Sequence, residues 1–317
     1  MRIGIISTSA LPTPPSGYGG IERLVAHLVA GLEELGHQVR LYAAEGSKLV
    51  PKLGLVTGAV EDQLGREACE DLESGVVDVV LDWSHSKPAS SLTARRDRVI
   101  SQAFWTDARG VNPVYPSRAV MIAFGGGGRV IYPGIDLSPY RAGDKEDYFI
   151  FFSRIIPEKG VERVISIAKM ANVRLLVAGH TGEMAYDKDY VRKIKSMCDG
   201  KIEFVGDVSE EEKVELLSRA RALLYWGNWL ESFGIFVVEA LACGTPCIVS
   251  SSSGGPAEIV VDRVSGFVCG GIDEFLRAMR MVDSIDPAAC AESAKYFSHR
   301  RMSRDWDRLL REVVGGA

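Results

Sequence analysis

Short runs of apolar, often β-branched residues alternate with amphipathic stretches along the whole chain. The first run, Ile3–Ser7, is followed by apolar residues at helical spacing from Ile21 to Leu35, and then by a second run, Gln38–Ala43. Gly36 stands where a glycine commonly ends a helix. Because strands that alternate with helices form parallel sheets, the pattern predicts an α/β protein built from βαβ units.

The alternation is interrupted at Leu137–Asp147, where Pro139, Gly143 and a charged run separate two series of elements. A chain of 317 residues has room for about two domains of roughly 150 residues each. We therefore expect an N-terminal domain over residues 1–136 and a C-terminal domain over residues 137–297, both doubly wound. In such folds ligands bind at the carboxyl ends of the strands, so the expected site is the crevice between the domains.

Composition excludes several classes of function. The 37 Lys and Arg residues against 42 Asp and Glu give a formal charge of −5, which provides no basic field for nucleic acid. The six cysteines and five histidines form no C-x-x-C pair and no group with metal-ligand spacing. No apolar stretch reaches the roughly 18 residues of a membrane span, and the N-terminus does not resemble a signal peptide. We expect a cytoplasmic protein with reduced thiols and no metal.

The most informative stretch begins at Glu231 and contains a second acid, Glu239, before a Gly and a Pro that end a helix. If the helix opens near Ser232–Gly234, the two carboxylates lie about 80° apart around its axis and roughly 12 Å apart along it. The free N–H groups around Phe233 and Gly234 then form an anion site. A ligand with a diphosphate between two hydroxyl-rich groups matches this arrangement. The alternative is that Glu231 is an acid of the first helical turn, favoured there by the helix dipole, and that Glu239 is a surface acid.

A second segment places two cations directly after the strand expected at Tyr148–Ser153. Arg154 can bind phosphate oxygens through its forked guanidinium, and Lys159 can act as a point charge. Both follow a strand end, where ligands of parallel sheets bind. The alternative for this pair alone is a solvated loop.

Taken together in their order and spacing, these segments and several others resemble the retaining glycosyltransferases of family 4, whose fold is GT-B, with two Rossmann-like doubly wound domains facing across a cleft. The resemblance covers nearly the whole chain. The segments that carry it are Tyr18–Glu22, Val130–Asp136, Arg154 with Lys159–Gly160, Phe204–Gly206, Glu231–Glu239, Gly254–Ile259 and Gly266–Phe267.

The resemblance implies a role for each matching residue. Arg154 and Lys159 would neutralise the diphosphate of a nucleotide-sugar donor. The backbone N–H groups of Gly19 or Gly20, and those of Phe233 or Gly234, would complete this cradle. Glu231 would contact the hydroxyls of the donor sugar, and Glu239 those of the ribose.

The resemblance also implies a domain arrangement and a reaction. The C-terminal helix, residues 298–317, would return to the N-terminal, acceptor-side domain, while residues 137–297 bind the donor. The donor would be a UDP-, GDP- or dTDP-sugar, and the acceptor a hydroxyl of a small molecule, glycan or lipid-linked compound. Reaction with retention would need no metal or other cofactor.

The acceptor side departs from the family pattern, because the histidines common in relatives are absent from the two segments after N-terminal strands. Asp82, His85 and Asp107 are alternative polar groups there, each with a loop or structural role as its competitor. An inactive nucleotide-sugar-binding protein is the alternative that these missing histidines favour, and a sugar-nucleotide epimerase or a phosphorylase of the same fold is the enzymatic alternative. The arginines after His299 fit the solvated face of a packed helix, and a weak peripheral contact with anionic lipid is the second interpretation.

Overall fold

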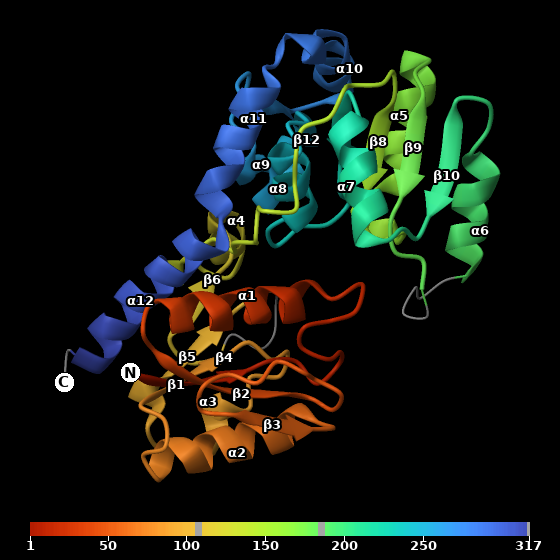
Figure 1. Ribbon diagram of the computed structural model, residues 1–317. Coiled ribbons are helices and arrows are strands. Elements are labelled where there is room, and N and C mark those ends of the chain that lie inside the picture. The colour runs from red at the N-terminus through yellow and green to blue at the C-terminus, as the bar shows by residue number, and fades with distance from the viewer. Residues whose placement is uncertain (105–109, 183–187, 316–317) are drawn as a thin grey trace. The chain divides into compact units, whose positions relative to one another are not determined.

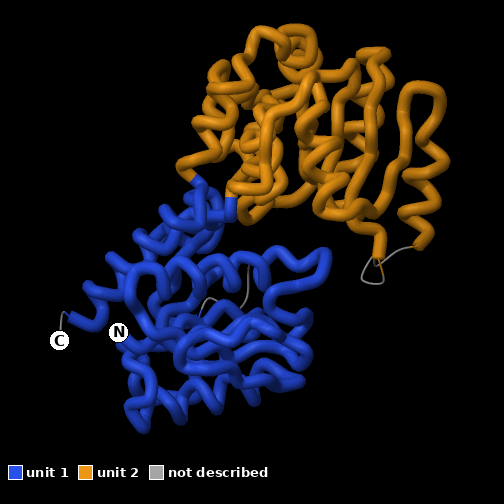
Figure 2. Tube along the Cα trace, in the orientation of Figure 1, with its two compact units in different colours: residues 1–136, 297–317 blue, residues 137–296 orange. Residues whose placement is uncertain are grey.

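The computed structural model describes residues 1–104, 110–182 and 188–315 and divides into two compact units (Figure 2). Unit 1 contains residues 1–136 and 297–317, and unit 2 contains residues 137–296. The chain therefore leaves unit 1 at the Pro- and Gly-containing interruption and returns to it before the last helix.

Unit 1 is built on a sheet of seven parallel strands, counted over its described residues (Figure 1). Their spatial order is β3-β2-β1-β4-β5-β6-β7. Their bounds are β1 Arg2–Ile6, β2 Gln38–Ala44, β3 Leu55–Gly58, β4 Val79–Asp82, β5 Val99–Gln102, β6 Pro113–Tyr115 and β7 Arg129–Val130.

The helices of unit 1 bury their apolar stripes. Leu24, Val25 and Leu28 of α1 are buried, as the helical spacing predicts. Residue Trp306 of the returning helix is fully buried, with its ring 5.7 Å from that of Trp83. The helices are α1 Gly20–Glu34, α2 Glu61–Glu73, α3 Ala89–Leu92, η1 Arg96–Arg98, α4 Arg118–Ala123 and α12 His299–Gly315.

Several arginines of α12 form ion pairs with aspartates of the same helix. Arg301 and Arg308 contact Asp305, and Arg311 contacts Asp307. The apolar side of the helix is buried, so α12 is a packed helix with a charged outer face. Contact of that face with lipid stays a prediction. No helix in the described part of the chain is long and apolar enough to cross a membrane.

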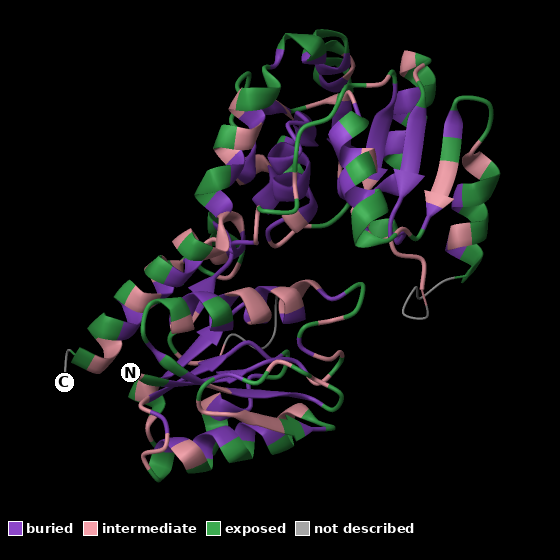
Figure 3. Ribbon diagram, viewed as in Figure 1, coloured by how far each residue is buried: buried purple, intermediate pink, exposed green. Residues whose placement is uncertain are grey.

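Unit 2 has a parallel sheet of six strands within its described residues, in the order β10-β9-β8-β11-β12-β13. The strands are buried on both faces except at β10 and at single positions of β8 and β13 (Figure 3). This explains why they read as continuous apolar runs. Their bounds are β8 Phe149–Phe152, β9 Leu175–Ala178, β10 Ile202–Gly206, β11 Ala222–Tyr225, β12 Cys247–Ser250 and β13 Gly266–Cys269.

The helices of unit 2 connect these strands. Helix α7 begins with a capping box, in which the Ser209 hydroxyl accepts from the Glu212 N–H and the Glu212 carboxylate accepts from the Ser209 N–H. The helices are η2 Pro157–Lys159, α5 Val161–Ala171, α6 Lys188–Met197, α7 Glu210–Arg219, α8 Ile235–Ala242, η3 Ser251–Ser253, α9 Gly255–Ile259, α10 Ile272–Met281, η4 Val282–Ser284, α11 Pro287–Ala294 and, at the unit boundary, η5 Lys295–Phe297.

The α/β prediction is confirmed by two parallel sheets with helical connections. Strands β3 and β6 have weak sequence signals, because the first three residues of β3 are not buried and β6 has three residues and begins with a proline. In each sheet the strand order reverses beside its first strand, between β1 and β4 in unit 1 and between β8 and β11 in unit 2. The loops that leave these strands diverge, which makes each reversal point a natural binding position.

Candidate functional site

The two predicted cations of unit 2 lie at the reversal point of its sheet. Arg154 follows β8 after a single residue, Ser153, and Lys159 ends the short η2 helix in the same connection. Tyr225 is the last residue of β11, the strand on the other side of the reversal point. Glu231 follows in the loop after β11, so four polar side chains come from two neighbouring strand ends.

Lys159 and Glu231 form an ion pair through Nζ and Oε2. Their side chains are only 16% and 13% exposed. The Tyr225 hydroxyl donates to the same oxygen at 3.3 Å. Burial acts to raise the pKa of the Glu231 carboxyl, but Lys159, Tyr225 and, more weakly, Arg154 outweigh it, so this pKa lies below its usual value. Glu231 is therefore an ionised, largely enclosed carboxylate.

The backbone of Glu231 is fixed by the segment after β12. Its N–H donates to the Ser253 carbonyl at 3.1 Å, and its carbonyl accepts from the Gly255 N–H at 2.9 Å. Gly254 lies between them with φ 76°, and a Cβ there would be 2.7 Å from the Glu231 carbonyl oxygen. Only glycine permits this approach, so the Gly-Gly pair of the sequence positions Glu231.

Lys159 is held by a similar constraint. Gly160 follows it with φ 72° and caps both η2 and α5. A Cβ at Gly160 would lie 1.9 Å from the carbonyl oxygen of Trp226. The Lys-Gly pair therefore packs against the chain just after β11, which brings the Lys159 ammonium to Glu231.

The predicted geometry of the two acids is wrong, because Glu231 is not part of the helix. It pairs with Gly254 as an isolated β-bridge, and α8 begins only at Ile235. Gly234 is the N-cap, with φ 98°, and makes no side-chain capping bond. The helical spacing of 80° and 12 Å thus does not apply. An anion site at Phe233 and Gly234 stays a prediction, consistent with an uncapped helix start.

Glu239 lies in a second polar network. It is 5% exposed, on a helix whose other residues are all apolar. Its Oε1 accepts from Lys213 Nζ at 2.7 Å and from the Tyr140 hydroxyl at 2.8 Å. The alternative that Glu239 is a surface acid is therefore wrong, and Glu231 is not an acid of the first helical turn, because α8 begins only at Ile235.

The glycines expected in the same cradle belong to unit 1. Gly19 has φ 150° and is the N-cap of α1, and Gly20 is the first residue of that helix. A Cβ at Gly19 would lie 2.7 Å from Pro15 Cβ, so the tight turn requires glycine. Buried Glu22 accepts from Thr8 in the loop after β1. Participation of Gly19 and Gly20 in binding the anion held by Arg154 and Lys159 stays a prediction.

The acceptor-side candidates differ in their outcomes. Asp107 lies outside the described residues. Asp82 is fully buried, where it accepts from the N–H groups of Ser84 and Ala89 and from the Ser84 hydroxyl, so its carboxylate closes the turn after β4. His85 is 44% exposed, and its Nδ1 lies 3.1 Å from Glu61 Oε1.

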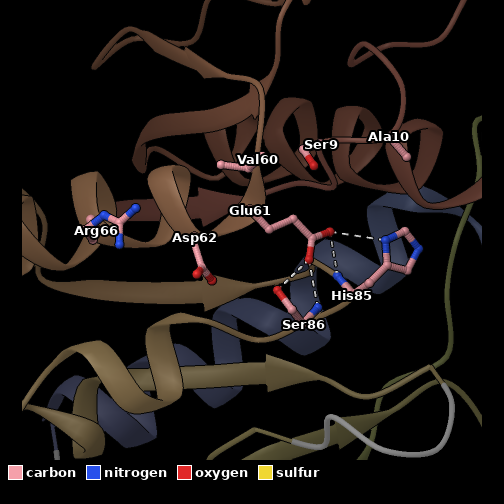
Figure 4. A pocket seen from close by; sticks show the side chains of 8 residues that line it. All are labelled: Ser9, Ala10, Val60, Glu61, Asp62, Arg66, His85 and Ser86. Carbon is pink, nitrogen blue, oxygen red and sulfur yellow. Dashed lines mark hydrogen bonds and ion pairs between the residues drawn. The ribbon is translucent and has the colours of Figure 1, made fainter.

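His85 and Glu61 line an open pocket of about 580 Å³ at the reversal point of unit 1 (Figure 4). In Figure 4 Asp62 and Arg66 lie on the opposite side of Glu61 from His85. Its lining residues come from the ends of β1, β3 and β4 and the start of α2: Ser9, Ala10, Val60, Glu61, Asp62, Arg66, His85 and Ser86.

Glu61 is the anchor of this pocket. It accepts from the N–H groups of His85 and Ser86 at 2.8 and 2.7 Å and from the Ser86 hydroxyl at 2.7 Å. Burial acts to raise the pKa of Glu61, but these bonds and the His85 ring lower it to about 2. Within the described residues no group of three or more His, Cys, Asp or Glu side chains could hold a metal ion.

Sequence reasoning does not find Tyr225, Tyr140, Lys213 or Glu61. The available signal was strongest for Lys213, since Val214 and Leu217 show that this side of α7 faces the core. A lysine at such a position requires a buried partner. For Tyr225 and Glu61 the partners are brought together only by the sheet topology, and no local pattern marks them.

Residues 137–285 match the family model of the glycosyl transferases group 1. A D-inositol 3-phosphate glycosyltransferase of Mycobacterium avium is 30% identical over 197 residues, which are 56% of this chain and 46% of that protein. The corresponding protein of Acidothermus cellulolyticus is 25% identical over 251 residues, or 71% and 54% of the two chains. The match thus spans about half the length of these curated relatives.

Solved structures match over the full length. AviGT4, a glycosyltransferase involved in avilamycin A biosynthesis, is 28% identical with a TM-score of 0.79, covering 100% of this chain and 98% of its own. Anabaena Alr3699/HepE, solved in complex with UDP-glucose, has a TM-score of 0.70 at 18% identity, covering 98% and 100%. At that identity the likeness is one of fold. The GT-B fold expected from the sequence is confirmed.

Proposed function

We propose that this chain, whose residues 137–285 match the glycosyl transferases group 1 family, is an enzyme that moves a sugar from a nucleotide-diphosphate sugar to a hydroxyl acceptor. The observation that carries the proposal is the enclosed pair of Lys159 and Glu231, with Arg154 and Tyr225, at the reversal point of unit 2. Such a cluster offers cations to a diphosphate and a carboxylate to sugar hydroxyls within one small site.

The two cations would stabilise the diphosphate as it leaves the sugar. As the bond between sugar and diphosphate breaks, negative charge develops on the leaving phosphate, and fixed cations stabilise that charge most in an enclosed site. The Lys159 ammonium and the Arg154 guanidinium are these cations. We assign the start of α8 at Gly234, which has no side-chain cap, to the same phosphates. Lys159 would exchange part of its contact with Glu231 for a phosphate oxygen when the donor binds.

The carboxylates are assigned to the two hydroxyl-rich ends of the donor. Glu231 stays ionised because its pKa is low, so it can accept hydrogen bonds from sugar hydroxyls. Glu239, on a different element, is assigned to the ribose. We propose reaction with retention by attack on the face that the diphosphate leaves, as in the resembled family 4 enzymes, without a covalent intermediate on Glu231 and without a required metal or other cofactor.

We assign the acceptor to unit 1. Its pocket at the β1/β4 reversal point offers an imidazole, hydroxyls and a guanidinium, which suits a hydroxyl-rich acceptor. Because the curated relatives are named D-inositol 3-phosphate glycosyltransferases, D-inositol 3-phosphate is one of the first acceptors to test. Because the Anabaena structure contains UDP-glucose, UDP-glucose is one of the first donors to test. We also propose that the enzyme is cytoplasmic and uses soluble nucleotide sugars.

The proposal is tested by thermal stabilisation against UDP-, GDP-, ADP- and dTDP-sugars, followed by turnover with a panel of acceptors. A donor at 100 times its Kd stabilises the folded state by about 2.7 kcal/mol. We expect one donor class to stabilise the chain and to release nucleoside diphosphate only with an acceptor present. Turnover should persist in EDTA, and NMR of the product should show the donor's anomeric configuration. Stabilisation by no nucleotide sugar would contradict the proposal.

A further inference from the structure

Helix α7 buries a lysine where an amphipathic helix normally carries an apolar residue. Lys213, Val214 and Leu217 face the core, and the Lys213 side chain is only 7% exposed. Lysine is almost never this buried without a partner, because removing an ammonium from water costs several kcal/mol. The position therefore needs an explanation beyond packing.

The partner is Glu239, on α8. Lys213 Nζ lies 2.7 Å from Glu239 Oε1 and 2.7 Å from Glu210 Oε2. Burial acts to lower the pKa of Lys213, but the two carboxylates outweigh it, so the pKa lies above its usual value and the side chain is charged. One positive charge thus lies between a buried and a half-exposed carboxylate.

Tyr140 completes the arrangement on the same oxygen. Its hydroxyl donates to Glu239 Oε1 at 2.8 Å, and Lys213 Nζ lies 5.9 Å from the centre of its ring. Glu239 Oε2 accepts no hydrogen bond from a described residue. It is also not completely buried, so a ligand hydroxyl can reach it. One carboxylate oxygen is therefore occupied by two donors, while the other remains available.

A purely structural ion pair explains this arrangement poorly. Buried ion pairs contribute little net stability, and apolar residues of similar size commonly replace them without loss. The rest of α8 is apolar, so a Leu or Met pair at positions 213 and 239 would pack between the two helices. A carboxylate that binds a ligand in one fixed direction must have one oxygen held by the protein and the other oxygen available. Glu239 has this arrangement.

We propose that Lys213 and Tyr140 are positioning residues that hold Glu239 Oε1 so that Oε2 accepts a hydrogen bond from one ribose hydroxyl of the donor nucleotide. The inference rests on the proposed function, in which Glu239 contacts the ribose. Lys213 has a second effect, since its charge offsets that of Glu239 in a unit that binds an anionic diphosphate. Because only one oxygen is available, Glu239 serves one hydroxyl strongly rather than two equally.

The test compares nucleotides that differ by one hydroxyl. Calorimetry on the full chain first identifies which of UDP, GDP and ADP binds most tightly, and then measures its 2′-deoxy and 3′-deoxy forms. A hydrogen bond to a charged group is worth about tenfold in affinity, so wild type should prefer the ribonucleotide to one deoxy form by about tenfold. Lys213→Met should reduce this preference to about twofold, and Lys213→Arg, which keeps the charge, should retain most of it.

Two further variants keep the result interpretable. Tyr140→Phe removes one hydroxyl at a half-buried position and should reduce the preference about threefold. Lys193→Met, which removes an exposed lysine paired with Glu162 in the same unit, should leave the preference unchanged. If Lys213→Met does not fold, Tyr140→Phe and Lys213→Arg decide.

The outcomes separate the inference from the function on which it rests. If Lys213→Met and Tyr140→Phe weaken ribo and deoxy forms equally, the pair is structural and the inference is wrong while the donor site stands. Equal binding of ribo and deoxy forms by wild type also overturns it. If wild type binds none of the nucleotides, the proposed function fails, and the inference fails with it.

Discussion

The reversal points of the two sheets are alike in topology and different in chemistry. In unit 2 the loops after β8 and β11 enclose Lys159 and Glu231, at 16% and 13% exposure. In unit 1 the loops after β1 and β4 border an open pocket, where His85 is 44% exposed beside a largely buried Glu61. The same fold position thus carries a charged, nearly closed site in one unit and a polar, open one in the other.

The way each carboxylate is held accounts for the difference. Backbone groups of Ser253 and Gly255 bond the backbone of Glu231, so its side chain remains directed at Lys159. The side chain of Glu61 instead accepts hydrogen bonds from the N–H groups of His85 and Ser86. These bonds fix the loop after β4 and leave the imidazole at the surface. The first arrangement suits a ligand group that never changes, such as a diphosphate. The second suits acceptors that vary.

The largest expected effect comes from breaking the enclosed pair. Lys159→Met should lower the rate of sugar transfer by about 10²–10³-fold, equivalent to 3–4 kcal/mol, because a fixed cation is lost where charge develops on the leaving phosphate. Without the ammonium, burial should raise the pKa of Glu231. Steady-state kinetics at saturating donor measures the rate.

Lys169→Met is the matched control for that variant. Lys169 is 38% exposed and pairs with Asp199 on the surface of unit 2, so its loss should change the rate less than twofold. Equal rates in Lys159→Met and Lys169→Met would remove Lys159 from the chemistry, and the contrast between the two reversal points would lose its meaning.

The next effect concerns the backbone that holds Glu231. Gly254→Ala should lower the free energy of unfolding by about 3 kcal/mol, because φ is 76° and the new Cβ would meet the Glu231 carbonyl oxygen at 2.7 Å. Gly17→Ala in unit 1, where nothing lies within 4 Å of the new Cβ, is the control and should be near neutral. Thermal unfolding of both variants measures the difference; an unchanged Tm in Gly254→Ala would show that the bridge is not tight.

Local patterns predict the elements of this fold and the residues that lie near strand ends. Arg154 and Lys159 can be placed near the carboxyl end of a strand because they follow a buried strand, whose apolar run is visible in the sequence. The partners of Lys159 cannot be placed this way. Glu231 comes from a loop 72 positions later, and only the order β8-β11 makes the two loops neighbours.

The error about Glu231 has a specific cause. The helical pattern from Ile235 to Ala242 continues backwards in the sequence without an obvious stop, so the helix is expected to begin near Ser232. What stops it is Gly234 in the left-handed region and the bridge between Glu231 and Gly254. The second cause is a contact with a segment more than twenty residues away, which a local pattern cannot contain.

A smaller effect is expected at the anchor of the open pocket. Glu61 has a pKa lowered to about 2 from an ordinary value near 4.5, so its ionisation stabilises the folded state above pH 4.5 and this contribution is lost as pH falls toward 2. Glu61→Gln should cost about 2 kcal/mol at pH 7, within the limit that such a shift sets.

The pH dependence distinguishes this cause from a general loss of packing. Between pH 6 and 3.5 the Tm of wild type should fall more steeply than that of Glu61→Gln, so the two curves converge on acidification. Parallel curves would mean that Glu61 is not held by charge, and that the pocket of unit 1 lacks an ionised anchor of the kind Glu231 provides in unit 2.

The smallest effect tests whether the two reversal points serve different substrates. His85→Ala removes an imidazole that lines the pocket and whose bond to Glu61 is largely exposed to water. We expect KM for the acceptor to rise about fivefold, near 1 kcal/mol, with nucleotide affinity unchanged. Ser74→Ala is the control, because it removes an exposed hydroxyl of the same unit that bonds the Glu70 carbonyl outside this pocket, and it should leave KM for the acceptor unchanged. If His85→Ala weakens nucleotide binding as much as acceptor binding, both reversal points serve the donor, and the open pocket is not a separate acceptor site.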